Sequence, residues 1–174
     1  MPPPLDRDRF SVPANATACA EYSFRQRFRV PARYAFRWCI DFVPYPWTDG
    51  SPHGARTVVW LAPRTVLLDD TFPIPHGGRV RKVKLVQIYP RTRSWVSTHL
   101  VGPNRCSQFR YSISADGPDA SALLFEGREL RWTGPRLSTT VERRLASRLR
   151  ANDAHLWKEF ASEMEQEFRA GTAP

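Results

Sequence analysis

Polar side chains at positions that alternate with apolar ones are the residues of this chain best placed to do chemistry. Asp70 alternates with Leu68 and Phe72, and His99 lies in a similar alternation further along the chain. Burying such a group without a partner costs free energy, so a polar residue on an inward face indicates a role. A histidine and a carboxylate in a desolvated pocket can exchange protons, because burial moves both pKa values toward neutrality. His99 with Asp70 or Glu126 is therefore a candidate catalytic acid/base set.

Ligand contacts are predicted at the alternating inward positions of the strands and on the flank of an apolar stripe near the C-terminus. Polar members of this set can orient a hydroxyl or carboxylate, and aromatic members can stack on a planar ring. The predicted ligand-binding residues are Leu68, Asp70, Phe72, Leu85, Gln87, Tyr89, His99, Tyr111, Asn152, His155 and Leu156. A competing interpretation places Glu126 and Arg128 on a solvated convex face and Asp70 in a local structural pair, because a one-residue slip exchanges the two faces of a strand.

Motifs of several enzyme and metal-site classes are missing from the sequence. It has no GxSxG and no HExxH, and the cysteines Cys19, Cys39 and Cys106 form no CxxC pair. The pair Gly77-Gly78 is too short to cradle a phosphate and is more typical of a hairpin turn. We therefore expect no metal and no cofactor.

Cysteine usage and the N-terminal residues bear on the compartment. Three widely spaced cysteines argue against a disulfide scaffold and for a reducing compartment, in which each is expected to be a small buried hydrophobe. Residues 1–9 lack a basic segment followed by an apolar one, so no secretory signal is expected. No stretch is apolar over the length that spans a bilayer. The expected location is the cytoplasm.

Composition predicts one folded domain behind a loose arm. The chain has 174 residues, of which 41% are hydrophobic and 25% charged, and this length suffices for one substantial core. Residues 1–20 are rich in Pro, Ala, Asp and Arg without periodicity, which predicts a flexible N-terminal arm. Residues 21–171 are predicted to form a single ligand-binding domain.

Apolar periodicity divides that domain into strands and helices. Residues 22–30 alternate with period two, which predicts a half-buried strand, and Pro31 opens a helix with aromatic residues at helical spacing. A turn-forming segment covers residues 45–54. Six further strands are predicted at residues 56–62, 65–72, 80–89, 95–101, 108–115 and 122–132. Because the links between them are short, these strands are expected to pair antiparallel.

The last segment, residues 137–170, predicts a long amphipathic helix, because it contains no proline or glycine and carries apolar residues at i, i+4 spacing. The stripe consists of Leu137, Val141, Leu145, Leu149, Leu156, Phe160, Met164 and Phe168. A helix with one long apolar face must lay that face on the sheet. The predicted fold class is α+β, a curved seven-stranded antiparallel sheet around a long C-terminal helix.

The order strand, helix, six-strand meander and terminal helix resembles the START-like superfamily, also called SRPBCC or helix-grip proteins, which includes polyketide cyclase-like proteins and lipid-transfer START domains. The resemblance covers about residues 22 to 170. It rests on the strand 22–30 followed at once by Pro31-Ala32-Arg33-Tyr34-Ala35-Phe36-Arg37-Trp38, and on the terminal amphipathic helix. The resemblance implies an internal pocket, since most members bind hydrophobic ligands and a minority catalyse cyclisation, dehydration or hydrolysis.

Elementary geometry leads to the same pocket. One helix cannot fill the whole concavity of a sheet that curls around it, so a space lined by the apolar strand face remains. The predicted function is therefore to bind or transport a hydrophobic small molecule, namely a lipid, a quinone or a polyketide-like aromatic. The alternative is a cyclase- or dehydratase-like enzyme that acts on such a ligand without a metal.

The net charge of +9 leaves a further alternative, an anionic partner. Basic residues at 79–84, with Arg25, Arg27 and Arg29, can form a positive convex surface that contacts nucleic acid, an acidic partner or a membrane surface. Solvated outer faces explain the same residues, and no nucleic-acid-binding motif is present. Nucleic acid is therefore the less favoured partner, and peripheral membrane contact is a weaker hypothesis still.

Overall fold

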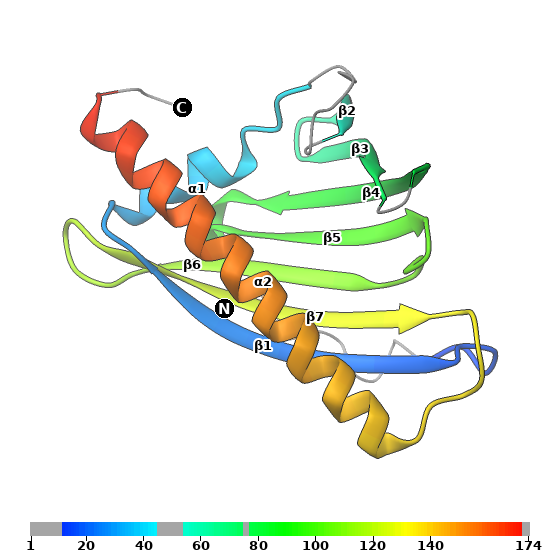
Figure 1. Ribbon diagram of the computed structural model, residues 1–174. Helices are drawn as coiled ribbons and strands as arrows, with labels where there is room; N and C mark the ends of the chain where they lie inside the picture. Colours follow the sequence, from blue (N-terminus) through cyan, green and yellow to red (C-terminus); the bar gives the residue numbers. More distant parts are fainter. Residues whose placement is uncertain (1–11, 45–53, 75–76, 172–174) are drawn as a thin grey trace.

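Residues 12–44, 54–74 and 77–171 are described by a computed structural model, in which one curved sheet cradles a long helix (Figure 1). The sheet has seven strands in the order β1-β7-β6-β5-β4-β3-β2, and every neighbouring pair is antiparallel. Short links join β2 to β7 in succession, and β1 pairs with β7, so the first and last strands meet side by side. The predicted helix-grip α+β fold is confirmed.

The elements follow the predicted order with small shifts at their ends. Their bounds are β1 Ala18–Phe28, α1 Ala32–Ile40, β2 Ala55–Ala62, β3 Thr65–Pro73, β4 Arg79–Tyr89, a single 3-10 turn Pro90–Thr92, β5 Ser94–Val101, β6 Gln108–Ala115, β7 Ser121–Arg131 and α2 Thr139–Arg169. Strand β1 begins at Ala18 instead of Tyr22, because the small residues Ala18 and Ala20 continue its buried face. Residues 1–11 of the predicted arm lie outside the described residues. So do residues 45–53 of the predicted turn segment.

Helix α1 starts directly after β1 because Pro31 precedes it with φ near −59°, a value that the proline ring fixes. Its inner face, Ala32, Ala35 and Phe36, is buried against the sheet. Helix α2 has 31 residues and lies diagonally across the concave face, mainly over β1 (Figure 1). Trp157, Ala161 and Met164 are its most buried residues. No helix in the described part of the chain is long and apolar enough to cross a membrane.

Aromatic rings fill the concave face beneath the N-terminal half of α2. Phe24 and Phe125 stack with ring centroids 4.7 Å apart, and Phe109 lies 5.9 Å from Phe125. Gly127 makes this packing possible, since a Cβ there would lie 2.9 Å from the Phe125 ring and 3.1 Å from Tyr22. This part of the trough is a filled core. The remaining space lies nearer to α1 and the strands β2 to β5.

Candidate functional site

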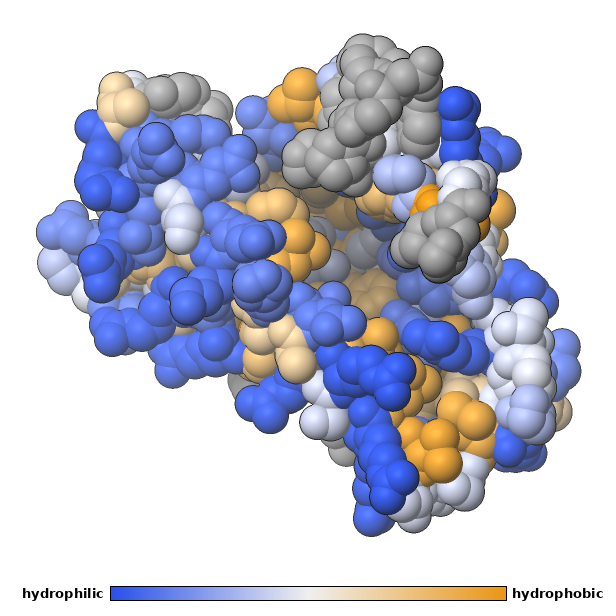
Figure 2. Space-filling view, in the orientation of Figure 1, coloured by the Kyte–Doolittle hydropathy of each residue, from blue (hydrophilic) through white to orange (hydrophobic). Residues whose placement is uncertain are grey.

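A cavity of about 520 Å³ opens between the two helices and the concave faces of β2 to β6. In the space-filling view the surface is hollowed beside α2, and apolar residues show inside the hollow (Figure 2). The cavity arises as predicted, because α2 covers one side of the curved sheet more closely than the other. Its lining divides into an aromatic wall and a charged end.

The aromatic wall comes from both helices, the segment that follows α1, and two central strands. It consists of Trp38, Phe42, Trp95, Tyr111, Trp157 and Phe160. Trp95 and Tyr111 are opposite each other in β5 and β6, and their rings stack nearly parallel at 4.7 Å and 5°. Trp157 meets Phe160 edge to face at 5.5 Å. Such flat and edge surfaces suit a planar apolar ligand, because offset stacking and edge contacts are both favourable for aromatic rings.

The charged end consists of Asp70 and the two cations that hold it, Arg56 and Lys84. The Asp70 side chain is fully buried; Arg56 Nε lies 2.6 Å from Asp70 Oδ1, and the Lys84 ammonium contacts Asp70 Oδ2. β-sheet register explains the cluster, since Arg56 is opposite Asp70 in β2 and β3 and Leu68 is opposite Lys84 in β3 and β4. Arg56 and Lys84 both line the cavity, as do two carboxylates, Asp41 and Glu167, of which Glu167 accepts a hydrogen bond from Trp38.

Burial and charge act in opposite directions on the protonation of this cluster. Burial opposes ionisation of Asp70, but hydrogen bonds and charge from Arg56 and Lys84 outweigh it, so the pKa of Asp70 lies below its ordinary value. For Lys84 burial is the larger effect, and despite the attraction of Asp70 the pKa of this ammonium is lowered. The result is an ionised Asp70 and a lysine that gives up its proton more readily than an exposed one.

His99 borders the same end of the cavity from β5, and its register partner is Lys84. Its Nδ1 lies 2.9 Å from Asn104 Oδ1, and Asn104 Nδ2 donates to Glu129 Oε2 at 3.5 Å. Burial lowers the pKa of His99 to about 4, assisted by the charges of Lys84 and Lys82 and opposed by Asn104 and Asp70. His99 is therefore a neutral imidazole at pH 7.

A second polar pair lies under α2. Tyr22 donates to Asp153 Oδ2 at 2.6 Å. Burial, followed by the hydrogen bond and charge of Asp153, raises the pKa of Tyr22, and burial raises the pKa of Asp153 despite that hydrogen bond. The pair anchors α2 to β1 and does not line the cavity. Within residues 12–44, 54–74 and 77–171, no group of three or more His, Cys, Asp or Glu side chains is arranged to hold a metal.

Four predicted ligand-binding residues lie at the cavity, and a fifth shares its face. Leu68, His99 and Tyr111 line it, and Asp70 holds its two lining cations. Phe72 is on the same face of β3 but further along, where Lys82 and Lys84 lie 5.5 and 6.0 Å from its ring centroid. The prediction of polar groups on this inward face thus identified the correct side of β3 and β5.

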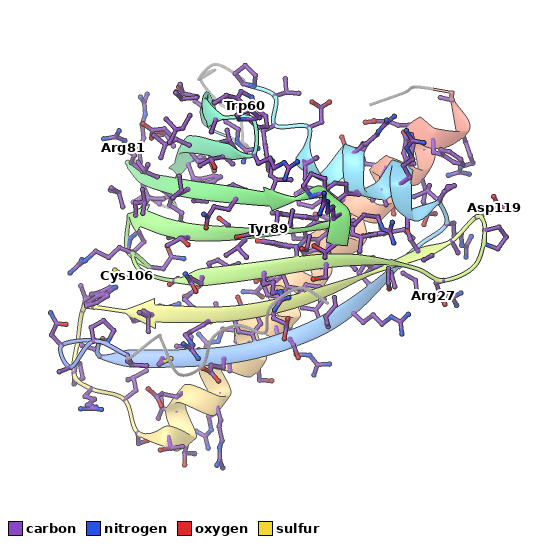
Figure 3. All side chains as sticks on the ribbon, turned by 180° about the vertical axis from the view of Figure 1, so that it is seen from behind. Arg27, Trp60, Arg81, Tyr89, Cys106 and Asp119 are labelled. Atoms are coloured by element: carbon purple, nitrogen blue, oxygen red, sulfur yellow. The ribbon has the colours of Figure 1, made fainter. Side chains whose placement is uncertain are left out.

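The predicted facing of β4 is wrong. Leu85, Gln87 and Tyr89 alternate with Val86 and Lys84, which line the cavity, so the three lie on the convex side. Tyr89 is 42% exposed at the end of β4, in the view from behind the sheet (Figure 3). The alternation in β4 gave the wrong facing because both faces of this strand carry apolar residues. In addition, the inward face carries lysines, which ordinarily indicate a solvent-exposed face.

The predicted helix residues Asn152, His155 and Leu156 are also misplaced. All three are exposed on the outer side of α2, where His155 lies 3.5 Å from Glu159. The neighbouring residue Trp157 is buried instead and reaches the cavity. Successive residues of an α-helix lie 100° apart around its axis, so Leu156 points away from the face that Trp157 shares with Ala161 and Met164, four and seven residues further on.

The predicted three-residue acid/base set is not assembled. Glu126 lies on the convex face of β7, opposite Arg110 in β6, with 3.9 Å between Arg110 Nε and Glu126 Oε2. His99 and Asp70 share the concave face, with Lys84 between them. Cys106, expected to be buried, is exposed, whereas Cys39 lines the cavity and burial raises the pKa of its thiol.

Sequence reasoning missed several residues that shape the site. Lys84 belongs to the basic stretch 79–84 that was expected on a convex surface, and neither Arg56 nor Asn104 was among the predicted site residues. One signal was available for Lys84: the β-branched residues Val86 and Ile88 lie two and four positions further along the strand, on the same face, and favour its burial. Nothing local marks Asn104, because its partners His99 and Glu129 come from other strands.

Comparison with known proteins gives likenesses in structure. No family model and no curated protein matches the chain by sequence. The ZhuI aromatase/cyclase from Streptomyces sp. R1128 superimposes with a TM-score of 0.70 at 12% identity, over 90% of this chain and 99% of that one. A START superfamily protein from Mycobacterium smegmatis gives 0.58 at 22% identity, over 84% and 97%. The protein Ara h 8.0201 gives 0.60 at 11% identity, over 84% and 98%.

Proposed function

We propose that this chain, which has the helix-grip fold of START and polyketide cyclase-like proteins, binds a flat hydrophobic molecule in the cavity beside α2. A quinone or a polyketide-like aromatic is the favoured ligand class. The observation that carries the proposal is the division of the cavity into an aromatic wall and a charged end. The ring body of the ligand stacks against Trp95 and Tyr111, and its oxygen-bearing end lies against Lys84 and Arg56.

Physical reasons favour a planar ligand over a flexible lipid. A ring system meets the parallel Trp95–Tyr111 stack over its whole face and loses little conformational freedom on binding. An alkyl chain must freeze a rotamer at each bond to fit the same space. The likeness in fold to an aromatase/cyclase is consistent with an aromatic ligand.

Binding is tested by titrating the protein with anthraquinone-2-carboxylate and with dodecanoate while tryptophan fluorescence is recorded. Both probes carry one carboxylate, but only the first is planar. We expect the anthraquinone to quench the fluorescence and to bind at least about ten-fold more tightly, a difference of about 1.4 kcal/mol. Native mass spectrometry of freshly purified protein then identifies any molecule that co-purifies.

A matched pair of variants locates the binding site. Ser97 lines the cavity, whereas Thr98 is on the other face of the same strand. Ser97→Phe fills the space and should weaken binding of the anthraquinone at least ten-fold, and Thr98→Phe should leave it unchanged. Far-UV circular dichroism verifies that both variants fold, since overpacking costs about 1–3 kcal/mol. Equal affinity in both variants would place the ligand elsewhere.

The alternative function, dehydration or ring closure of the bound molecule, is favoured by one specific observation. His99 is neutral and borders the cavity opposite Lys84, whose ammonium has a lowered pKa. His99 can take a proton from the carbon beside a ketone while the C–O bond of a β-hydroxyl breaks and Lys84 supplies the proton that completes water. Solvent returns the proton from His99 to Lys84 after the product leaves.

The alternative is tested with 4-hydroxy-4-phenylbutan-2-one, whose dehydration gives an enone that absorbs in the near ultraviolet. An enzyme of this type accelerates enone formation, and His99→Gln abolishes the acceleration while the variant still binds anthraquinone-2-carboxylate. A rate equal to that of buffer for the unaltered protein, together with tight binding of the anthraquinone, supports a binding role alone.

A further inference from the structure

We infer that His99 and Lys84 form a two-point hydrogen-bonding site, in which His99 Nε2 accepts from a ligand hydroxyl and Lys84 donates to a nearby carboxylate or enolate oxygen. The inference rests on the proposed function and narrows its ligand class to hydroxylated aromatic acids and hydroxyketones. Asn104 and Glu129 are the positioning residues, because they determine which nitrogen of His99 carries the proton. Figure 3 shows the β5–β6 loop that contains Asn104, marked there by Cys106.

The hydrogen-bond chain fixes the His99 tautomer. A carboxylate only accepts, so Glu129 Oε2 orients the Asn104 amide with its nitrogen toward Glu129 and its oxygen toward His99. Asn104 Oδ1 then also only accepts, so the proton of the neutral imidazole resides on Nδ1. His99 Nε2 is left with a lone pair. Arg131 donates to the other oxygen of Glu129 at 3.0 Å and keeps the carboxylate in place.

The backbone of the loop holds Asn104 against His99. The Cys106 amide donates to the His99 carbonyl at 2.7 Å, and the His99 amide donates to the Ser107 carbonyl at 2.9 Å. Cys106 has φ near 64°, in the left-handed region that residues other than glycine rarely adopt. This local strain is consistent with a loop whose shape is set by the position that Asn104 must occupy.

The other nitrogen of His99 faces the cavity. Among the described residues no buried side-chain nitrogen or oxygen lacks a hydrogen-bond partner. His99 is only 8% exposed and bonds through Nδ1 alone within that set, so Nε2 borders open space, and the cavity is the space that His99 lines. Lys84 lies opposite in the sheet with three N–H donors, of which Asp70 takes a share. An acceptor and a donor therefore face the same ligand end.

Three probes distinguish the two contacts. 4-Hydroxy-2-naphthoate carries both groups at positions too far apart to bond each other, 4-methoxy-2-naphthoate lacks the hydroxyl proton, and 1-naphthol lacks the carboxylate. We expect calorimetry to show that the unaltered protein binds the hydroxy acid at least ten-fold more tightly than either of the others. Equal affinity for the hydroxy and methoxy acids would overturn the role of His99 Nε2, as would failure of all three probes to bind a protein that binds anthraquinone-2-carboxylate.

Variants separate the two contacts from each other. Asn104→Leu removes the anchor of Nδ1 and should reduce the preference for hydroxy over methoxy acid to less than three-fold, without weakening the methoxy acid. Lys84→Met should weaken both acids about ten-fold and leave 1-naphthol unchanged. If these variants keep the wild-type preferences while Ser97→Phe abolishes binding, the inference fails and the proposed function stands. If Ser97→Phe leaves all binding intact, both fail.

Nitrogen NMR of the unaltered protein tests the tautomer directly. The chemical shifts and proton couplings of the His99 ring should report a proton on Nδ1, and Asn104→Leu should give a mixture of the two tautomers. A proton on Nε2 in the unaltered protein would overturn the inference, even if Asn104→Leu does not fold. Restoring the acceptor with Asn104→Asp should restore the Nδ1 proton, which loss of packing alone would not do.

Discussion

Two neighbouring aspartates, Asp69 and Asp70, illustrate how burial determines the contribution of an ion pair to stability. Asp70 is fully buried between Arg56 and Lys84. Asp69, on the opposite face of β3, pairs with Arg81, whose side chain is 62% exposed. Removing Asp70 takes the bridging carboxylate from Arg56 and Lys84, whose side chains are only 23% and 16% exposed, whereas Arg81, the partner of Asp69, is already largely in water.

Asp70→Asn should therefore lower the free energy of unfolding by about 3 kcal/mol, and Asp69→Asn by less than about 1 kcal/mol. Urea denaturation of the two variants measures the difference. Because the pKa of Asp70 is lowered on folding, its contribution is complete above the ordinary value of 3.8 and is lost as pH falls through the folded pKa. Similar losses in both variants would show that the Asp70 cluster is no more desolvated than the surface pair.

His99 gives the protein a separate dependence on pH. The unfolded chain takes up a proton on this residue near pH 6.5, and the folded chain only near pH 4. Between these values the unfolded state binds more protons, so stability rises with pH, by at most about 1.4 kcal/mol per unit. The groups around the ring are Asn104, Lys84, Lys82 and Asp70.

We expect His99→Gln to flatten the stability profile between pH 4 and pH 6.5, the two pKa values of this residue. The amide of Gln can still bond Asn104, so the variant tests the charge separately from the hydrogen bond. Thermal unfolding at half-unit steps of pH measures the slope, and His155→Gln, an exposed histidine on α2, is the control. An unchanged slope in His99→Gln would mean that the imidazole ionises in the folded state as freely as in the unfolded one.

At the level of elements, periodicity identified strands and helices but not always their faces. In β3 the apolar face is unambiguous, so Leu68 and Asp70 were placed on the correct side. In β4 the inward face consists of Lys82, Lys84, Val86 and Ile88. Lysines on this face contradict the expectation, used to assign the faces, that charged residues point to solvent. Lys84 can lie on the inward face because it forms an ion pair with Asp70 on the neighbouring strand. This pairing depends on the register between β3 and β4 and cannot be inferred from the sequence of β4 alone.

Helix α2 shows the same limit in another form. Its buried face includes Asp153, which bonds Tyr22 and breaks the apolar stripe at one turn. The predicted stripe therefore continues at Leu156, although the buried residue is Trp157, which contacts Phe28, Tyr111 and Phe160. A buried polar residue whose hydrogen-bond partner lies on another helix or strand cannot be recognised from the apolar periodicity of its own segment.

Adjacent substitutions in α2 test this assignment of its faces. Trp157→Ala should lower the free energy of unfolding by about 3–5 kcal/mol, because it empties a site between aromatic rings. Leu156→Ala should change it by less than about 0.5 kcal/mol, since Leu156 is 43% exposed and alanine is at least as good a helix former. Chemical denaturation measures both, and comparable losses would reverse the assignment.

For the whole molecule, the order of elements was predictable because it depends on many residues at once. A meander of strands with short links has to pair antiparallel, and a long helix with one apolar face has to cover it. The cavity follows from that geometry alone. Its chemistry does not, because the charged end and the His99 network are built from β2, β3, β4, β5, β7 and a loop, joined by register.

The distribution of charge also emerges only in three dimensions. Of the residues that suggested a basic convex surface, Lys82 and Lys84 face inward. Arg27 and Arg81, which mark two separate regions in Figure 3, pair with Asp116 and Asp69. Arg128, on the same face, pairs with Glu21 at 2.7 Å. Three arginines of the described convex face, Arg27, Arg81 and Arg128, are thus each paired with a carboxylate, which reduces the positive charge that a phosphate backbone would meet there.

This arrangement predicts weak, salt-sensitive contact with nucleic acid. A fluorescein-labelled twenty-nucleotide thymidine strand should bind with a Kd above about 1 µM at about 0.15 M salt, within the non-specific range, and the affinity should fall steeply as salt rises. Fluorescence anisotropy measures both quantities. Saturating the cavity with anthraquinone-2-carboxylate should leave the anisotropy titration unchanged, because the ligand lies inside the trough and the strand outside it. Submicromolar binding that resists added salt would instead require stacking of bases on the protein, and would make the basic face a functional surface in its own right.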